Sequence, residues 1–176
     1  MPSMPSRDAD ANADAPPYCI DPDQFLDLSG AVPVGREDVM AAWDRAYALA
    51  EQRLLELGPE AHFYVVFGLQ GAGKSTWVAA QSQLGPRLAV YLSGPLPSRR
   101  HRERALLMAA RVGCRKRIGV WIHAPFDVAM ARNAQRSGLA RIKEETMRHV
   151  FESLEPPTLE EGFDEVMVIS SSPTPA

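Results

Sequence analysis

The sequence has few of the residues that mark several large classes of protein. Its two cysteines, Cys19 and Cys114, lie far apart without a CxxC spacing, which argues against a disulfide scaffold and a cysteine metal site. No apolar run approaches the roughly 18 residues that span a bilayer, and no apolar signal region stands at the N-terminus. We therefore expect a cytoplasmic protein that does not associate with membranes.

A strong charge imbalance is also lacking. The 176 residues carry a formal net charge of -3, which argues against a protein whose whole surface binds nucleic acid or lipid. The length fits one domain, and 45% of hydrophobic residues is enough to form its core. Residues 1–17 and 171–176 are rich in proline and small or polar residues, so we expect both to be disordered tails.

Alternating apolar patterns predict the secondary structure between these tails. Short apolar runs indicate buried strands at residues 62–67, 88–92, 119–123 and 165–169. Helical patterns are found at residues 74–83, 98–112, 126–136 and 143–154. This alternation predicts an α/β fold over residues 61–170, with helices on both faces of a parallel sheet of about four strands. Residues 18–60 are expected to form an N-terminal helical extension, with a capped turn at 21–25 and a helix at 36–57.

A phosphate-binding pattern lies between the first expected strand and the next helix. The segment Gly68-Leu69-Gln70-Gly71-Ala72-Gly73-Lys74-Ser75 satisfies the P-loop motif, in which glycines let backbone N–H groups point at phosphates. The helix adds its positive N-terminal end. A glycine turn without a ligand is the alternative, but it has no need of a lysine and a hydroxyl at these positions. The residues expected to bind a nucleoside triphosphate are Gly68, Gly71, Ala72, Gly73, Lys74, Ser75 and Thr76.

Two residues of this motif have specific expected roles. Lys74 should contact the β- and γ-phosphates of ATP, and the Ser75 hydroxyl should be a ligand of Mg²⁺. The asparagines, Asn12 and Asn133, do not form the signature that reads guanine, so a GTPase is not expected.

An ordered series of further segments follows the loop: Ala124-Pro125-Phe126-Asp127, Arg132-Asn133-Ala134-Gln135-Arg136, residues 154–157 and residues 161–166. With these segments, the chain over about residues 63–169 resembles the P-loop kinases related to polynucleotide kinase and zeta toxin. The resemblance implies a three-layer αβα P-loop NTPase domain, here with a reduced parallel sheet. It also implies a lid over the nucleotide, in which Arg132 and Arg136 contact phosphates and stabilise charge during transfer.

The spacing of the two arginines agrees with this implication. Arg132 and Arg136 are four residues apart, so on a helix both would project from one face and could clamp a triphosphate. A solvated basic helix face is the alternative. The following Ser137-Gly138 pair would provide a flexible break for a closing loop.

The sequence departs from the resembled kinases in its acidic residues. In the resembled kinases, a second strand that carries the acceptor-activating acid follows the P-loop helix. Here only residues 79–87 intervene before the next expected strand, so that strand and its acid are missing. Ser93 stands where an acid near the Mg²⁺ waters is expected. His101 and Glu103 are candidate replacements, although an exposed polar pair on a helix is the more ordinary explanation.

A basic cluster completes the pattern. Its members are Arg99, Arg100, Arg102, Arg104, Arg111, Arg115, Lys116 and Arg117. The cluster indicates either a solvated face or a surface that binds an anionic acceptor, such as a nucleic-acid end or a nucleotide sugar. The sequence thus predicts an ATP- and Mg²⁺-dependent kinase acting on a hydroxyl of an anionic acceptor. A nucleotide-binding module without efficient transfer is the alternative that the missing acids favour. A nucleic-acid-binding protein that uses nucleotide only structurally is a third hypothesis.

Overall fold

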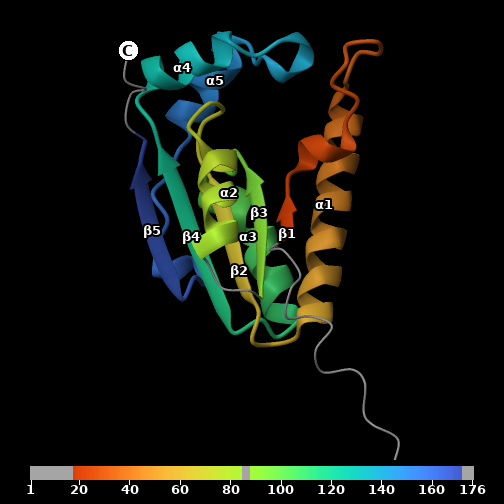
Figure 1. The fold of residues 1–176 in the computed structure, drawn as a ribbon, viewed down its shortest axis with the longest axis vertical. Helices are drawn as coiled ribbons and strands as arrows, with labels where there is room; N and C mark the ends of the chain where they lie inside the picture. Colours follow the sequence, from red (N-terminus) through yellow and green to blue (C-terminus); the bar gives the residue numbers. More distant parts are fainter. Residues whose placement is uncertain (1–17, 85–87, 172–176) are drawn as a thin grey trace, which may run out of the picture.

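The computed structural model describes residues 18–84 and 88–171, and Figure 1 shows their arrangement. The tail expected at 1–17 lies outside the described residues, as does the tail expected at 171–176 apart from Ser171, whose N–H donates a hydrogen bond to the carbonyl oxygen of His123. The strands are β1 (Tyr18–Ile20), β2 (His62–Phe67), β3 (Ala89–Gly94), β4 (Lys116–His123) and β5 (Glu165–Ser170). The α-helices are α1 (Arg36–Leu57), α2 (Lys74–Leu84), α3 (Arg99–Arg111), α4 (Phe126–Ala134) and α5 (Glu144–Glu152). Short 3₁₀ helices are η1 (Pro22–Phe25), η2 (Gly138–Ala140) and η3 (Leu159–Glu161).

The α/β class and the predicted elements are confirmed. Helix α1 and strand β2 have the predicted bounds, while the other predicted elements differ by a few residues at their ends. Residues 21–25 form the predicted capped turn, since Asp21 is the N-cap of η1. Apolar periodicity located these elements because each is long enough to show a complete pattern.

The expectation of four strands is wrong, because the sheet has five strands in the order β1-β3-β2-β4-β5. The additional strand, β1, pairs in parallel with β3 at the edge of the sheet, and Ile20 is the partner of Leu92. A strand of three residues is too short to show alternation in the sequence. Residues 18–60 therefore contribute a strand to the sheet as well as the expected helix.

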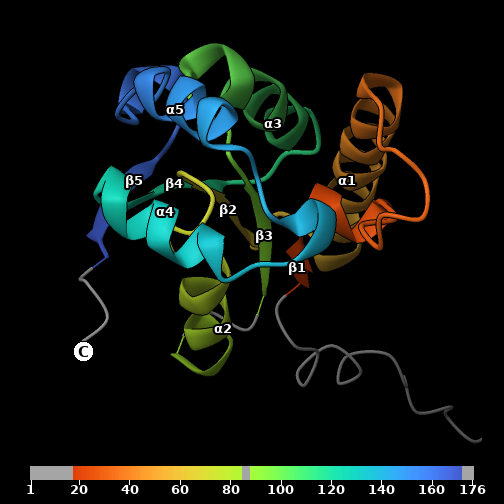
Figure 2. The same ribbon diagram turned by 90° about the horizontal axis from the view of Figure 1, so that it is seen from above.

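Helices cover both faces of the sheet, which gives the three layers expected. Helices α1 and α3 pack on one face, against Phe63, Val65 and Phe67 of the central strand β2. Helices α2 and α4 pack on the other face, together with Val66 of the same strand. Figure 2 shows α2 and α3 on opposite sides of the sheet. Within the described residues, no helix combines the length and the apolar character needed to cross a membrane.

Candidate functional site

The predicted phosphate-binding loop lies at the carboxyl end of the central strand. Strand β2 ends at Phe67 and α2 begins at Lys74, so the connecting loop stands at the edge where ligands bind in open α/β sheets. Gly68 and Gly71 both have positive φ. A Cβ on Gly68 would collide with the carbonyl oxygen of Ile122, and a Cβ on Gly71 with that of Ala129. Glycine is therefore required where the loop packs closely on β4 and α4.

Lys74 begins α2 and turns its side chain back over this loop. Its Nζ donates hydrogen bonds to the carbonyl oxygens of Gly68, at 2.9 Å, and Leu69, at 3.1 Å. Burial lowers the pKa of Lys74 to about 8, and the nearby Asp21 carboxylate opposes this shift. The ammonium group is thus held beside the loop by carbonyl groups that are weaker partners than phosphate.

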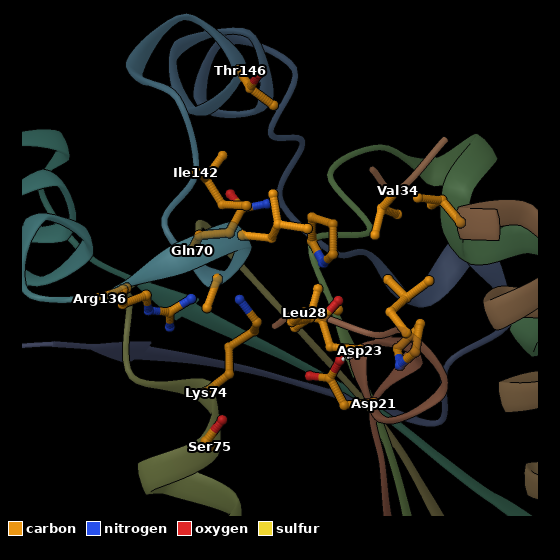
Figure 3. A pocket seen from close by; sticks show the side chains of 18 of the residues that line it. Asp21, Asp23, Leu28, Val34, Gln70, Lys74, Ser75, Arg136, Ile142 and Thr146 are labelled. Carbon is orange, nitrogen blue, oxygen red and sulfur yellow. Dashed lines mark hydrogen bonds between the residues drawn. The ribbon is translucent and has the colours of Figure 1, made fainter. Parts of the chain in front are cut away.

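A cavity of about 650 Å³ lies over the loop, and Figure 3 shows part of its lining. This volume is in the range of small-molecule binding sites. Four segments surround it: the loop with the start of α2, the segment from Asp21 to Trp43, Gly94 and Pro95 at the end of β3, and the segment from Arg132 in α4 to Thr146 in α5. The predicted site residues that line it are Gly71, Gly73, Lys74, Ser75, Thr76, Arg132 and Arg136. The loop residues Gly68 and Ala72 are buried and do not line the cavity.

The two predicted lid arginines reach the cavity in different ways. Arg132 lies in the last turn of α4, and its Nη1 donates to Ser171 Oγ at 2.6 Å and to the carbonyl oxygens of Gly71 and Ala72. Helix α4 ends at Ala134, so the expectation that Arg132 and Arg136 share a helical face is wrong. Arg136 instead follows the helix end, where it is exposed at the cavity.

Asn133, between these arginines, fixes the connection between α4 and α5, which we call the lid connection because the sequence predicts a lid there. Its buried side chain donates to the carbonyl oxygen of Ile142 at 2.7 Å and accepts from the Ile142 N–H at 2.9 Å. The segment between the two residues contains η2 and projects toward the N-terminal segment (Figure 2). A Cβ on Gly138 would lie 3.4 Å from the carbonyl oxygen of Leu28. The lid connection and the N-terminal segment therefore meet at the cavity.

Sequence reasoning missed Asp21, which lines the same cavity. It directly follows β1, at the carboxyl edge of the sheet, and it accepts a hydrogen bond from the Asp23 N–H at 2.9 Å. Burial raises the pKa of Asp21, while the charges of Lys74 and Arg136 lower it. The Asp-Pro pair in the sequence indicated a cap but not that the cap sits at the end of a strand. The N-terminal segment thus places one carboxylate in the cavity that Lys74 also lines.

In the sequence, Ser93 stands where an acid near the metal is expected, but its side chain does not line the cavity. It is 1% exposed, and its Oγ has no hydrogen-bond partner within the part of the chain that the structure describes. A buried hydroxyl without a partner costs free energy, so a water molecule or ligand group is expected beside it. Among the described residues, no cluster of three or more His, Cys, Asp or Glu side chains could hold a metal.

The other candidate acids and bases lie away from this cavity. His101 Nδ1 is 2.7 Å from Ser98 Oγ near the start of α3, and Glu103 lines a separate hollow of about 450 Å³ beside α3. Neither residue lines the cavity over the glycine-rich loop. The proposed replacement of the missing acid by His101 or Glu103 is therefore wrong.

The basic cluster is largely neutralised within the chain. Arg102 is fully buried, where Nε and Nη2 each donate to Glu161 at 2.8 Å and the guanidinium stacks on Phe67. Further ion pairs join cluster residues to acids: Arg99–Glu160, Arg104–Asp44, Arg111–Glu51, Arg115–Glu60, Lys116–Glu165 and Arg117–Asp164. None of the cluster residues lines the cavity over the loop.

Comparison with known proteins finds partial similarity. No family model and no curated protein matches the sequence. Among solved structures, an unliganded sugar kinase from Janibacter sp. shares 14% identity at a TM-score of 0.44, over 88% of this chain and 70% of that chain. The AvrRxo1-ORF1:AvrRxo1-ORF2 structure with sulphate ions shares 14% identity at a TM-score of 0.38, over 64% of this chain and 57% of that chain. At these scores the function has to be inferred from the site itself.

Proposed function

We propose that the protein is an ATP-dependent phosphotransferase that moves the γ-phosphoryl group of ATP to a hydroxyl group of an acceptor. One observation carries the proposal: a glycine-rich loop with Lys74, two arginines and the carboxylate of Asp21 all face one cavity. A loop that only bound phosphate would need neither the second arginine nor a carboxylate. In this proposal residues 61–170 form the P-loop kinase-like core, and residues 18–60 complete its acceptor side.

The phosphates of ATP would bind at the N-terminus of α2. Backbone N–H groups of the loop and the helix end provide the cradle, and Lys74 exchanges the carbonyl oxygens of Gly68 and Leu69 for the β- and γ-phosphates. Arg132, already hydrogen-bonded to the loop, would contact bound ATP, whereas the exposed Arg136 would engage as the lid closes. The resemblance to the polynucleotide kinase and zeta toxin group supports these two roles.

The residues present fit a magnesium ion bound together with ATP. The exposed hydroxyl of Ser75 lines the cavity and can serve as a ligand. The Oγ of Ser93 is buried without a hydrogen-bond partner among the described residues, and it would be the group that hydrogen-bonds a metal-bound water. When bound, Mg²⁺ neutralises charge on the β- and γ-phosphate oxygens.

Asp21 would act as the general base. In the step, the acceptor oxygen forms a bond to the γ-phosphorus, the bond to the β,γ-bridging oxygen breaks, ADP leaves, and the acceptor proton passes to Asp21. Burial raises the pKa of Asp21, which makes the carboxylate a stronger base than an exposed aspartate. The absence of both usual acids is what favours a module without transfer; Asp21 would supply the acceptor-activating acid, while Ser93 leaves the metal-shell acid unreplaced.

The test is incubation with γ-labelled ATP and Mg²⁺ against nucleic-acid ends, nucleotide sugars and small alcohols. We expect label in at least one product with the unmodified protein and none with Lys74→Ala. The variant Lys116→Ala is the matched control, since Lys116 is at the start of β4 and does not line the cavity. Normal ATP binding without label in any product would instead establish the non-transferring alternative.

A further inference from the structure

The cavity over the loop has two ends of different chemistry. Its cationic side chains within the described residues, Lys74, Arg132 and Arg136, come from α2, α4 and the lid connection. The other end is formed by the N-terminal segment, and Figure 3 shows Asp21, Asp23, Leu28 and Val34 across the cavity from Arg136. We name this the acceptor end; its residues are Asp21, Asp23, Leu26, Leu28, Val34, Val39 and Trp43.

The acceptor end is largely apolar. Trp43 is half-buried, and its indole ring lies over Gly94, where an added Cβ would be 2.5 Å from the ring atom Cη2. Val39 is 39% exposed one turn earlier on α1, and Leu139 of the lid connection also lines the cavity. Apolar side chains exposed in a cavity favour a ligand whose own apolar surface covers them.

The charges at this end disfavour an anionic ligand. Its charged side chains are the carboxylates of Asp21 and Asp23. The three cationic side chains that line the cavity lie at the opposite end, where they would face the triphosphate, so a negative charge on the acceptor would lie beside two carboxylates with no cationic side chain of the acceptor end to pair with. The basic cluster on α3, which had suggested an anionic acceptor, does not line the cavity.

From these two features we infer that the acceptor is a small alcohol with an apolar body and no negative charge. The inference rests on the proposed function and specifies its second substrate. The hydroxyl group would lie near Asp21, and the apolar body would cover Val39 and Trp43. ATP would occupy the opposite end, so the two substrates meet between Asp21 and Lys74.

The first test compares three probes that share a phenyl group and a hydroxyl but differ in charge. These are neutral phenylpropanediol, cationic phenylalaninol and anionic phenyllactate, each supplied with γ-labelled ATP and Mg²⁺. We expect transfer to the neutral or the cationic probe at least about tenfold faster than to phenyllactate. Equal or faster transfer to phenyllactate would overturn the inference.

A binding measurement separates failure of this inference from failure of the proposed function. If no probe is phosphorylated, the proposed transfer is contradicted, and thermal unfolding in the presence of ADP still reports which probes bind. A rise in Tm with phenylpropanediol or phenylalaninol, but not with phenyllactate, would support the apolar, non-anionic acceptor end. No shift with any probe, or an equal shift with phenyllactate, would overturn it.

A charge placed at the acceptor end provides the second test. Val39→Lys adds a cation to the cavity wall, while the matched control Met40→Lys adds the same charge at a neighbouring exposed position of α1 that does not line the cavity. We expect Val39→Lys to shift preference toward phenyllactate by about tenfold with the KM for ATP unchanged, and Met40→Lys to leave the preference as it was. A changed KM for ATP with unaltered preference would place the nucleotide at this end, and no change in either would exclude this end as the acceptor site.

Discussion

Asp21 and Lys74 act on each other's ionisation across the cavity. Burial raises the pKa of Asp21, and the Lys74 ammonium opposes that rise; burial lowers the pKa of Lys74 to about 8, and the Asp21 carboxylate opposes that fall. The two groups belong to the strand-turn segment at the start of the described chain and to the first turn of α2. Under the proposed function, this proximity would place the lysine that binds phosphate beside the carboxylate that accepts the acceptor's proton.

The variant Lys74→Ala should weaken ATP binding much more than AMP binding. The lysine is assigned to the β- and γ-phosphates, which AMP lacks, and a charge-assisted hydrogen bond to phosphate contributes about 1.5–3 kcal/mol. Calorimetric titration of both nucleotides measures the difference, with Lys116→Ala as the control. Equal losses for ATP and AMP would contradict the assignment of Lys74.

Alanine variants of the two arginines should differ in how they affect the transfer rate and ATP affinity. Arg136→Ala is expected to lower phosphoryl transfer by on the order of 10³-fold while ATP affinity falls much less, because the exposed Arg136 engages only as charge develops on the transferred group. Arg132→Ala should lower both quantities, since Arg132 already hydrogen-bonds the loop carbonyls of Gly71 and Ala72. ATP affinity and single-turnover rate measured on both variants test this. If rate and affinity fell by the same factor in Arg136→Ala, then Arg136 would bind the ground state and the transition state equally, which would contradict its assigned role.

Removal of the Ser93 hydroxyl should affect metal-dependent binding but not folding. Ser93→Ala deletes a buried Oγ that has no partner in the described residues, so the Tm should stay the same or rise. ATP affinity should fall severalfold in Mg²⁺ and stay unchanged in EDTA, where no metal-bound water needs the hydroxyl. An equal loss of affinity with and without Mg²⁺ would exclude Ser93 from the metal's surroundings.

The buried ion pair between Arg102 and Glu161 should make a large contribution to stability. Arg102→Met leaves the Glu161 carboxylate buried and uncompensated, and the free energy of unfolding should fall by about 3–5 kcal/mol. The double variant Arg102→Met, Glu161→Leu should recover much of the lost free energy of unfolding, because no buried charge is left unpaired. The exposed pair of Arg115 and Glu60 is the matched control, and Arg115→Met should cost less than about 1 kcal/mol in urea unfolding. Equal losses for Arg102→Met and Arg115→Met would contradict the account of the buried pair.

The sequence predicted the main body of the fold because local patterns determine it. Helix α1 and strand β2 have complete apolar periodicities, and the glycine-rich loop follows from residue types that a phosphate cradle requires. Strand β1 could not be predicted in the same way. Its three residues enter the sheet through pairing with the distant β3, and such a non-local contact leaves no pattern in a short segment.

Short sequence motifs located two of the segments that line the candidate cavity. Except for Gly68 and Ala72, the predicted loop residues line the cavity, as do both arginines. The position of Arg136 beyond the end of α4 goes with the hydrogen bonds of Asn133 to Ile142, which lie outside the helix. Asp21 and Trp43 reach the cavity from a segment that precedes the motif. Charge patterning overestimated the basic surface for a related reason, since the acids that pair with Arg102 and Arg117 lie far away in the sequence.

The central claim is that the N-terminal strand supplies the base that completes a phosphotransferase site, and Asp21→Asn tests it most directly. Asparagine retains the N-cap of η1, so the variant removes the base and leaves the local structure in place. Single-turnover transfer should fall by about 10²–10⁴-fold, whereas ATP affinity should change by no more than roughly threefold, and Asp23→Asn, at the neighbouring exposed aspartate, should transfer at a near-normal rate. Transfer by Asp21→Asn at the rate of the unmodified protein would contradict the account.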